Sequence, residues 1–143
     1  MVYDFIDTLA QNYLDDGIIT YKANGKRRFV KTVFNYLEDV TGIDFKRVGR
    51  RRSAEIDIDF TDEVTGGAAG YALTWSSGRS EVQVDPTTWH WQSTTSHEIA
   101  HALGLEHDHF TTQSITSYNR DYSEWRWYEQ DFNNLLPAYE PFI

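Results

Sequence analysis

Apolar residues recur with helical spacing in three stretches of the chain. Residues 3–14 carry one such stripe, residues 29–40 carry a longer one that Gly42 ends, and residues 125–136 carry a third just before Pro137. Residues three and four positions apart share one face of a helix, and glycine and proline commonly end one. The pattern predicts an N-terminal, a central and a C-terminal helix, carried by Val2, Phe5, Ile6, Leu9, Tyr13, Phe29, Val30, Val33, Phe34, Leu37, Val40, Trp125, Tyr128, Phe132, Leu135 and Leu136.

Other stretches alternate between apolar and polar residues, as strands do. The alternation is strict over residues 54–60, with Ile56, Ile58 and Phe60 on one face and acidic residues on the other. Shorter strands are predicted at residues 18–22, 44–48, 71–75 and 81–84, separated by turns at Asn24-Gly25 and Gly66-Gly67. We therefore expect an α+β (mixed α/β) domain in which helices back a five-stranded sheet.

Length, charge and cysteine content limit the class of protein. The 143 residues suffice for one domain spanning 1–143, with residues 1–17 as an N-terminal helical segment. The net charge of −9 argues against nucleic acid as a partner. The chain has no cysteine and therefore no disulfide or thiol-based latency device. It shows neither a membrane span nor a signal-peptide pattern, so we expect no membrane partner. Secretion or particle association would need another export route or a leader already removed, and we expect a monomer unless the chain belongs to a larger assembly.

Residues 97–107 fit the pattern H-E-x-x-H-x-x-G-x-x-H. On a helix His97 and His101 leave the same face, because they are four residues apart. Gly104 can adopt a positive φ at low cost, so the helix can stop and the chain can bring back His107 as a third ligand. Three neutral imidazoles with one open position are typical of catalytic zinc. Glu98 follows the first ligand and is suited to act as general base on a metal-activated water.

Two other interpretations of this stretch involve no catalysis. The histidines could simply pack on a buried amphipathic helix, or Glu98 could close a capping box with Thr95. The capping box would begin the helix at Ser96 and leave only a stub, so we expect the helix to begin near Gln92 or Ser93. His90 and His109 are interpreted as ordinary polar residues, although His109 is close enough in sequence to line the site.

The chain resembles the metzincin clan of zinc endopeptidases over most of its length. Beyond the zinc motif, Ala54 to Phe60 is similar to the clan's third strand, and Gly70 to Trp75 to its antiparallel edge strand. Val82 to Trp89 resembles the last strand and its exit toward the active-site helix. The resemblance implies a twisted mixed five-stranded sheet with an antiparallel edge strand, a backing helix, an active-site helix and a C-terminal helix.

Ser114 to Tyr118 is similar to the turn below the metal in these enzymes, but Thr116 replaces its methionine. In the clan that methionine forms an apolar floor under the metal, and a threonine brings a hydroxyl that needs a partner. In the astacin-like and serralysin-like branches a tyrosine at the position of Tyr118 binds resting zinc and then hydrogen-bonds the transition state; alternatively Tyr118 packs and holds the turn. Asp108 resembles the adamalysin-like pattern, in which it would orient the turn or a ligand histidine, or it is a spectator. These features come from different branches, so no branch is assigned.

The resemblance implies a peptide or protein substrate and hydrolysis by a metal-activated water. The peptide would pair with the edge strand, made of Tyr71, Ala72, Leu73, Thr74 and Trp75. A pocket walled by the zinc helix and residues 117–120 would select side chains, with Arg120 favouring an acidic one or lying at the surface. The alternatives are a metzincin-like zinc-binding structural or interaction module with little or no activity, and a hydrolase of small non-peptide molecules.

Two acidic groups carry weaker hypotheses. The carboxylates Glu55, Asp57, Asp59, Asp62 and Glu63 could form a calcium site, or simply the solvated face of a strand. The N-terminal segment, with Asp4, Asp7, Asp15 and Asp16, could fold over the cleft and offer zinc a carboxylate. The simpler expectation is a helix packed on the body of the domain.

Overall fold

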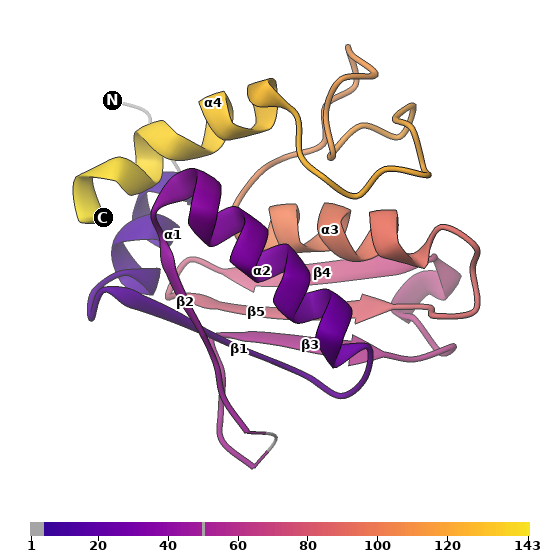
Figure 1. The fold of residues 1–143 in the computed structure, drawn as a ribbon, viewed down its shortest axis with the longest axis horizontal. Helices are drawn as coiled ribbons and strands as arrows, with labels where there is room; N and C mark the ends of the chain where they lie inside the picture. Colours follow the sequence, from indigo (N-terminus) through magenta and orange to yellow (C-terminus); the bar gives the residue numbers. More distant parts are fainter. Residues whose placement is uncertain (1–4, 50) are drawn as a thin grey trace.

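A mixed five-stranded sheet forms the base of the molecule in the computed structural model, which describes residues 5–49 and 51–143 (Figure 1). The strand order is β2-β1-β3-β5-β4. β1, β2, β3 and β5 are mutually parallel along this order, whereas β4 pairs antiparallel to β5 at the edge. The predicted α+β class and the antiparallel edge strand are confirmed. The strands are β1 (Ile18–Ala23), β2 (Asp44–Arg47), β3 (Ile56–Phe60), β4 (Gly70–Trp75) and β5 (Arg79–Val84).

Helices cover one face of this sheet. α2 (Arg27–Thr41) and α3 (Trp91–Ala102) lie over the strands, and α4 (Glu129–Tyr139) lies above them with the loops that follow α3 (Figure 1). α1 (Phe5–Tyr13) contacts α4, and short 3-10 turns span Thr65–Gly67 and Glu140–Phe142. The stripe predicted for α2 is buried except for Phe29, which is partly buried, and Val40, which is 47% exposed. Gly42 ends this helix as expected, with φ of 79°.

The predicted boundaries of the C-terminal helix were wrong at both ends. The helix begins at Glu129 rather than Trp125, because the Asp131 carboxylate accepts the backbone N–H of Tyr128 at 2.9 Å and caps the helix there. It also continues through Pro137 to Tyr139. Proline removes one helical hydrogen bond, but Tyr139 is fully buried and its hydroxyl donates to the carbonyl of Leu103 at 2.7 Å.

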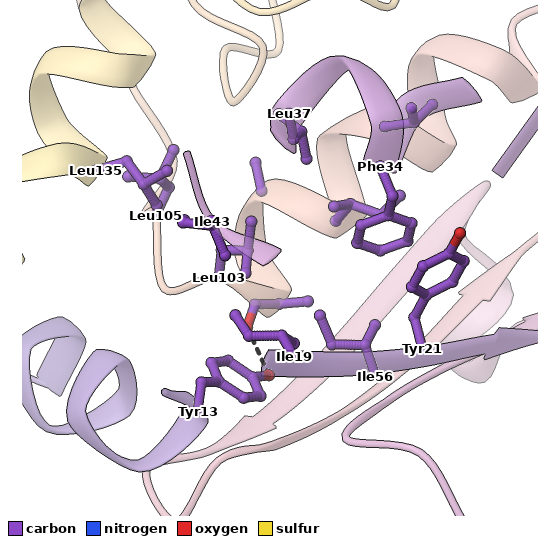
Figure 2. Packing of buried hydrophobic residues seen from close by; sticks show 14 of the residues in the cluster. Tyr13, Ile19, Tyr21, Phe34, Leu37, Ile43, Ile56, Leu103, Leu105 and Leu135 are labelled. Atoms are coloured by element: carbon purple, nitrogen blue, oxygen red, sulfur yellow. Dashed lines mark hydrogen bonds between the residues drawn. The ribbon is translucent and has the colours of Figure 1, made fainter. Parts of the chain in front are cut away.

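α3 begins at Trp91, slightly earlier than expected. The hydroxyl of Thr95 donates to the Trp91 carbonyl at 2.7 Å, which places Thr95 inside the helix and makes the capping-box interpretation wrong. At the other end, the last carbonyls of a helix need partners outside it. The buried hydroxyl of Tyr13 supplies one to Ala102 at 2.9 Å (Figure 2). Together with Tyr139, this bond fixes the end of α3 from which the metal-site loop departs.

The core lies between the sheet and the helices. Tyr21 on β1 stacks on Phe34 of α2 with ring centroids 4.0 Å apart, and Ile19 and Ile56 continue the layer toward Leu103 (Figure 2). The opposite face of the sheet carries charged residues, with Asp57 3.7 Å from the Lys22 ammonium, and also the exposed Leu73 and Trp75 of β4. None of the described helices is long and apolar enough to cross a membrane.

Candidate metal centre

Three histidine side chains converge at the end of α3. The Nε2 atom of His101 lies 3.1 Å from that of His97 and 3.0 Å from that of His107. Across residues 5–49 and 51–143, this is the only group of three or more histidine, cysteine or carboxylate side chains arranged to hold a metal ion. The three residues predicted from the motif are therefore brought together. The acidic residues considered for calcium form no such group in the described chain.

The second ring nitrogens explain why the cluster suits a cation. Nδ1 of His97 is 2.7 Å from the carbonyl oxygen of Ile115, and Nδ1 of His101 is 2.7 Å from that of Leu105. A carbonyl can only accept, so each Nδ1 donates and each neutral ring keeps its lone pair on Nε2. Burial lowers the pKa of His97 well below its usual value and that of His101 to about 4, so both rings are neutral at pH 7. Lone pairs facing each other at this distance repel unless a cation lies between them, and imidazole is a common ligand of zinc.

Gly104 brings the chain from the helix to His107. Its φ is 102°, a conformation that side chains rarely adopt. A Cβ at this position would also lie 2.8 Å from Cγ1 of Ile6 on α1. Both the positive φ of this turn and the close approach of α1 require glycine at position 104. Leu9 and Tyr13 of α1 are buried, which favours a helix packed on the body. Asp4 of the proposed latency segment lies outside the described residues.

Glu98 lies beside the cluster and is only 6% exposed. Its Oε1 is 3.8 Å from Nε2 of His97. Burial raises the pKa of the Glu98 carboxyl to about 7, and the positive charge of Arg120 partly offsets this shift. The side chain can therefore accept or release a proton near neutral pH, as a general base and acid must.

We expect Glu98→Gln to stabilise the metal-free protein at pH 8. The pKa of the Glu98 carboxyl is near 4.5 in the unfolded chain and about 7 in the folded protein. The folded protein therefore loses stability as the pH rises from the first value through the second, because the buried carboxyl must ionise. Glutamine removes that cost, which corresponds to about 3 kcal/mol. Urea unfolding with a chelator, at pH 8 and at pH 5, measures it. The gain should shrink strongly at pH 5, and an equal gain at both pH values would contradict the assignment.

Gly70, the first residue of β4, gives Glu98 its space. A Cβ on Gly70 would lie 2.6 Å from Cγ2 of Thr94 and 2.9 Å from Cγ of Glu98. The helix and the edge strand therefore approach more closely here than any side chain on Gly70 would permit. The sequence predicts Gly70 at the start of the edge strand but not its close contact with Glu98.

We expect Gly70→Ala to lower the free energy of unfolding by about 1–3 kcal/mol, because an overpacked contact must be relieved by displacing α3 or β4. Chemical denaturation of the metal-free protein measures the loss. Gly49→Ala is the matched control, since a Cβ there meets nothing within 4 Å. Equal stability of the two variants would show that the contact is not tight.

The turn at residues 114–118 lies under the cluster and is tied to α4. Asp131, which is 1% exposed, accepts the hydroxyl of Ser114 at 2.5 Å and the backbone N–H of Ile115 at 2.9 Å. The hydroxyl of Thr116 lies 2.8 Å from that of Ser114. The Ser114 hydroxyl donates its hydrogen bond to the Asp131 carboxylate, so the Thr116 hydroxyl is the donor to Ser114. The threonine that replaces methionine thus has its partner, and Asp131 holds the residue whose carbonyl orients His97.

Asp108 orients the loop rather than a ligand histidine. Its Oδ1 accepts hydrogen bonds from the backbone N–H groups of Phe110 and Thr111, and its Oδ2 accepts one from the side-chain amide of Gln130 at 2.5 Å.

Tyr118 lies beside the histidine cluster and is 56% exposed. Its ring stacks on that of His107 at a centroid distance of 4.6 Å. The ring is therefore not packed inside the turn. His109 is also near, with its ring centroid 6.1 Å from that of His107.

The cluster opens into a cleft of about 730 Å³ beneath the edge strand. β4 lines one wall through Gly70, Tyr71, Ala72 and Thr74, whereas Leu73 and Trp75 are exposed outside it. Arg120 lines the opposite part of the cleft and is only 6% exposed, so its interpretation as a surface arginine was wrong. The other lining residues are Ala68, Ala69, Trp89, His90, Thr94, His97, Glu98, His101, His107, Tyr118 and Tyr122.

The mixed sheet, its antiparallel edge strand and the helix below define a metzincin-like fold. A chain of the ECX AB5 holotoxin in its GM1-bound form shares it with a TM-score of 0.66 and 16% identity, covering 96% of this chain and 84% of that one. Archaemetzincin from Archaeoglobus fulgidus, solved in complex with malonate, is similar with a TM-score of 0.50 and 13% identity. The match covers 81% of this chain and 98% of that one. At such identities the likeness shows the fold alone. No protein-family model matches the sequence, and no curated protein matches it.

Proposed function

We propose that this chain is a zinc-dependent endopeptidase. The observation that carries the proposal is the convergence of three neutral histidine Nε2 atoms beside a buried carboxyl with a pKa near 7, in a cleft under an edge strand. Three imidazoles are a common ligand set for catalytic zinc, which keeps one coordination position open. His97, His101 and His107 would hold the ion, and the carbonyls of Ile115 and Leu105 orient the first two of these rings.

A bound zinc ion supplies Lewis acidity, which lowers the pKa of water and polarises a carbonyl group. In the proposed mechanism Glu98 takes the proton from the attacking water and passes it to the leaving amine. A hydrogen bond from the Tyr118 hydroxyl would stabilise the tetrahedral oxyanion. The exposure of Tyr118 beside His107 leaves its ring free of the packing that would prevent this role.

The backbone of β4 suits an extended peptide. The N–H of Asp85 bonds to the carbonyl of Ala69, and in an antiparallel pair such bonds alternate along the strand. Residues 71, 73 and 75 therefore bond to β5, and Gly70, Ala72 and Thr74 direct their backbone groups to the open edge. These groups are available to a substrate strand, and all three residues line the cleft.

A second candidate is a metzincin-like structural or interaction module with little turnover. It is favoured by the likeness to a chain of an AB5 holotoxin, which its name describes as an assembly. A scaffold has no need of a buried carboxyl beside three histidines, so the peptidase is preferred.

Metal analysis combined with digestion of an unstructured protein separates the candidates. We expect one equivalent of zinc, and cleavage that a chelator abolishes and zinc restores. His101→Ala should lose both zinc and cleavage, because the Nε2 atom of His101 lies between those of His97 and His107, 3.1 Å from the first and 3.0 Å from the second. His109→Ala, an exposed histidine outside the cluster, is the control and should keep both. Zinc without cleavage of any protein or peptide would favour the module, or a small-molecule hydrolase.

A further inference from the structure

Arg120 is a buried cation in the wall of the cleft. Its Nε donates to the hydroxyl of Ser93 on α3 at 2.9 Å, and its Nη1 donates to the carbonyl of Ser117 at 2.9 Å. The guanidinium carbon lies 4.2 Å from the centroid of the Tyr122 ring. These contacts fix the position and plane of the guanidinium group. The side chain is therefore preorganised before any substrate enters.

Arg120 forms no salt bridge within the described chain, although its charge interacts with that of Glu98, which lines the same cleft. None of the ion pairs there includes this residue. Burying an unpaired charge is costly, and charged groups in protein interiors are normally paired. A guanidinium has five N–H donors, and the two hydrogen bonds above together with one to the Tyr122 hydroxyl occupy only some of them. The remaining donors belong to a side chain that lines the cleft, so a ligand in the cleft can supply the missing partner.

Arg120 is also close to the reaction centre. It lines the same cleft as Glu98 and the three histidines. Its hydrogen-bond partner Ser93 lies on α3, about one helical turn before the metal-site residue His97. A substrate group bound to Arg120 would therefore lie near the scissile bond rather than at a distant part of the peptide.

We propose that Arg120 binds a carboxylate of the substrate close to the scissile bond, so that the cleft selects acidic peptides. The inference rests on the proposed peptidase function. A planar guanidinium held from one side can offer its free N–H groups to both oxygens of a carboxylate, a pairing that lysine does not reproduce. The carboxylate has two sources, an aspartate or glutamate side chain or the free C-terminus of a peptide.

The test begins with the unmodified protein. Cleavage sites in an unstructured protein are mapped by mass spectrometry, and peptides are then made with glutamate or glutamine at each of three positions on either side of the bond. At one position glutamate should raise kcat/KM by about tenfold or more, the effect of one charge-assisted contact. A second pair of peptides has either a free or an amidated C-terminus. Faster cleavage of the peptide with the free C-terminus would identify the terminal carboxylate as the group that Arg120 binds. Cleavage with no preference for either carboxylate overturns the inference and leaves the peptidase standing.

Variants assign the preference to Arg120. Arg120→Gln should remove the preference and Arg120→Lys should reduce it to a few-fold. Arg126→Gln is the matched control, because Arg126 is 61% exposed and lies outside the cleft, and it should keep the full preference. A purely structural arginine would lower kcat/KM equally for both peptides, and that result overturns the inference. Because the comparison between peptides is made within each protein, partial unfolding of a variant cannot imitate it.

Binding supplies a readout that does not depend on turnover. Zinc-loaded Glu98→Gln protein is titrated with fluorescent glutamate and glutamine peptides, and with succinate and succinamide. Tighter binding of the carboxylate in either pair, lost in the double variant with Arg120→Gln, supports the inference even if no peptide is ever cleaved. Carboxylate-selective binding without any cleavage would refute the proposed peptidase function but not the role of Arg120 in binding a carboxylate. Equal binding of carboxylate and amide would refute the inference.

Discussion

Glu98→Gln is expected to keep one equivalent of zinc and to lose peptide hydrolysis by about 10²–10⁴-fold, the contribution typical of a general acid–base group. Glutamine has nearly the same shape, so the histidines should remain where they are. It cannot take a proton from water or give one to the leaving amine. The loss should therefore appear in kcat, with little change in KM.

Peptide cleavage assays and metal analysis of the same samples measure both quantities. Glu140→Gln is the matched control, because Glu140 is exposed and lies at the far end of α4, outside the residues that line the cleft. Its activity should equal that of the unmodified protein. Glu98→Gln activity within tenfold of the unmodified protein would mean that another group acts as base.

The metal cluster could be predicted from the sequence because its geometry is local. A helix of normal pitch brings His97 and His101 together, and one glycine with positive φ brings back the third ring from six residues away. The alternation of apolar and acidic residues in β3 and the apolar stripe on α2 also predicted which faces are buried, because these patterns are local as well. Each depends only on the repeat of one element and on which side of it is apolar.

The features that could not be predicted depend on contacts between distant segments. Arg120 is buried because its guanidinium reaches Ser93, 27 residues away, and no local pattern distinguishes it from a surface arginine. Gly70 matters because of the helix that crosses it. The C-terminal helix runs past Pro137 because the Tyr139 hydroxyl donates to the carbonyl of Leu103, just after the end of α3. In each case a tertiary contact outweighs the local preference.

Thr116 shows how such a contact changes the meaning of a substitution. In the sequence it appears as a hydroxyl where the clan has an apolar floor. In the structure that hydroxyl continues a chain of hydrogen bonds through Ser114 to Asp131, and all three side chains are buried. The floor under the histidines is therefore polar and fully paired. The hydroxyls of Thr116 and Ser114 are held there by directed hydrogen bonds that end at the Asp131 carboxylate.

Asp131→Ala is expected to lower the free energy of unfolding of the metal-free protein by about 3–5 kcal/mol. The carboxylate accepts three hydrogen bonds, from the Ser114 hydroxyl and from the backbone N–H groups of Ile115 and Tyr128. Each buried donor left without a partner costs about 1–3 kcal/mol, and total stabilities of domains are about 5–15 kcal/mol. Chemical denaturation with a chelator present measures the loss. Asp121→Ala, at an exposed carboxylate that bonds only within its own turn, is the control.

Zinc affinity distinguishes a positioning role for Asp131 from simple stabilisation. Asp131 holds Ile115 by its backbone N–H and also binds Ser114, whose hydroxyl oxygen accepts the Thr116 N–H in the same peptide group as the Ile115 carbonyl. That carbonyl accepts Nδ1–H of His97, so Asp131→Asn should weaken zinc binding by about 10–100-fold, the usual effect of altering a ligand's hydrogen-bonded support. Competition with a chromogenic chelator, under conditions where the variant is fully folded, measures that affinity. A purely structural Asp131 would leave the affinity of the folded fraction unchanged. Because His101 takes its orientation from Leu105 instead, the loss should be smaller than that caused by removing a histidine.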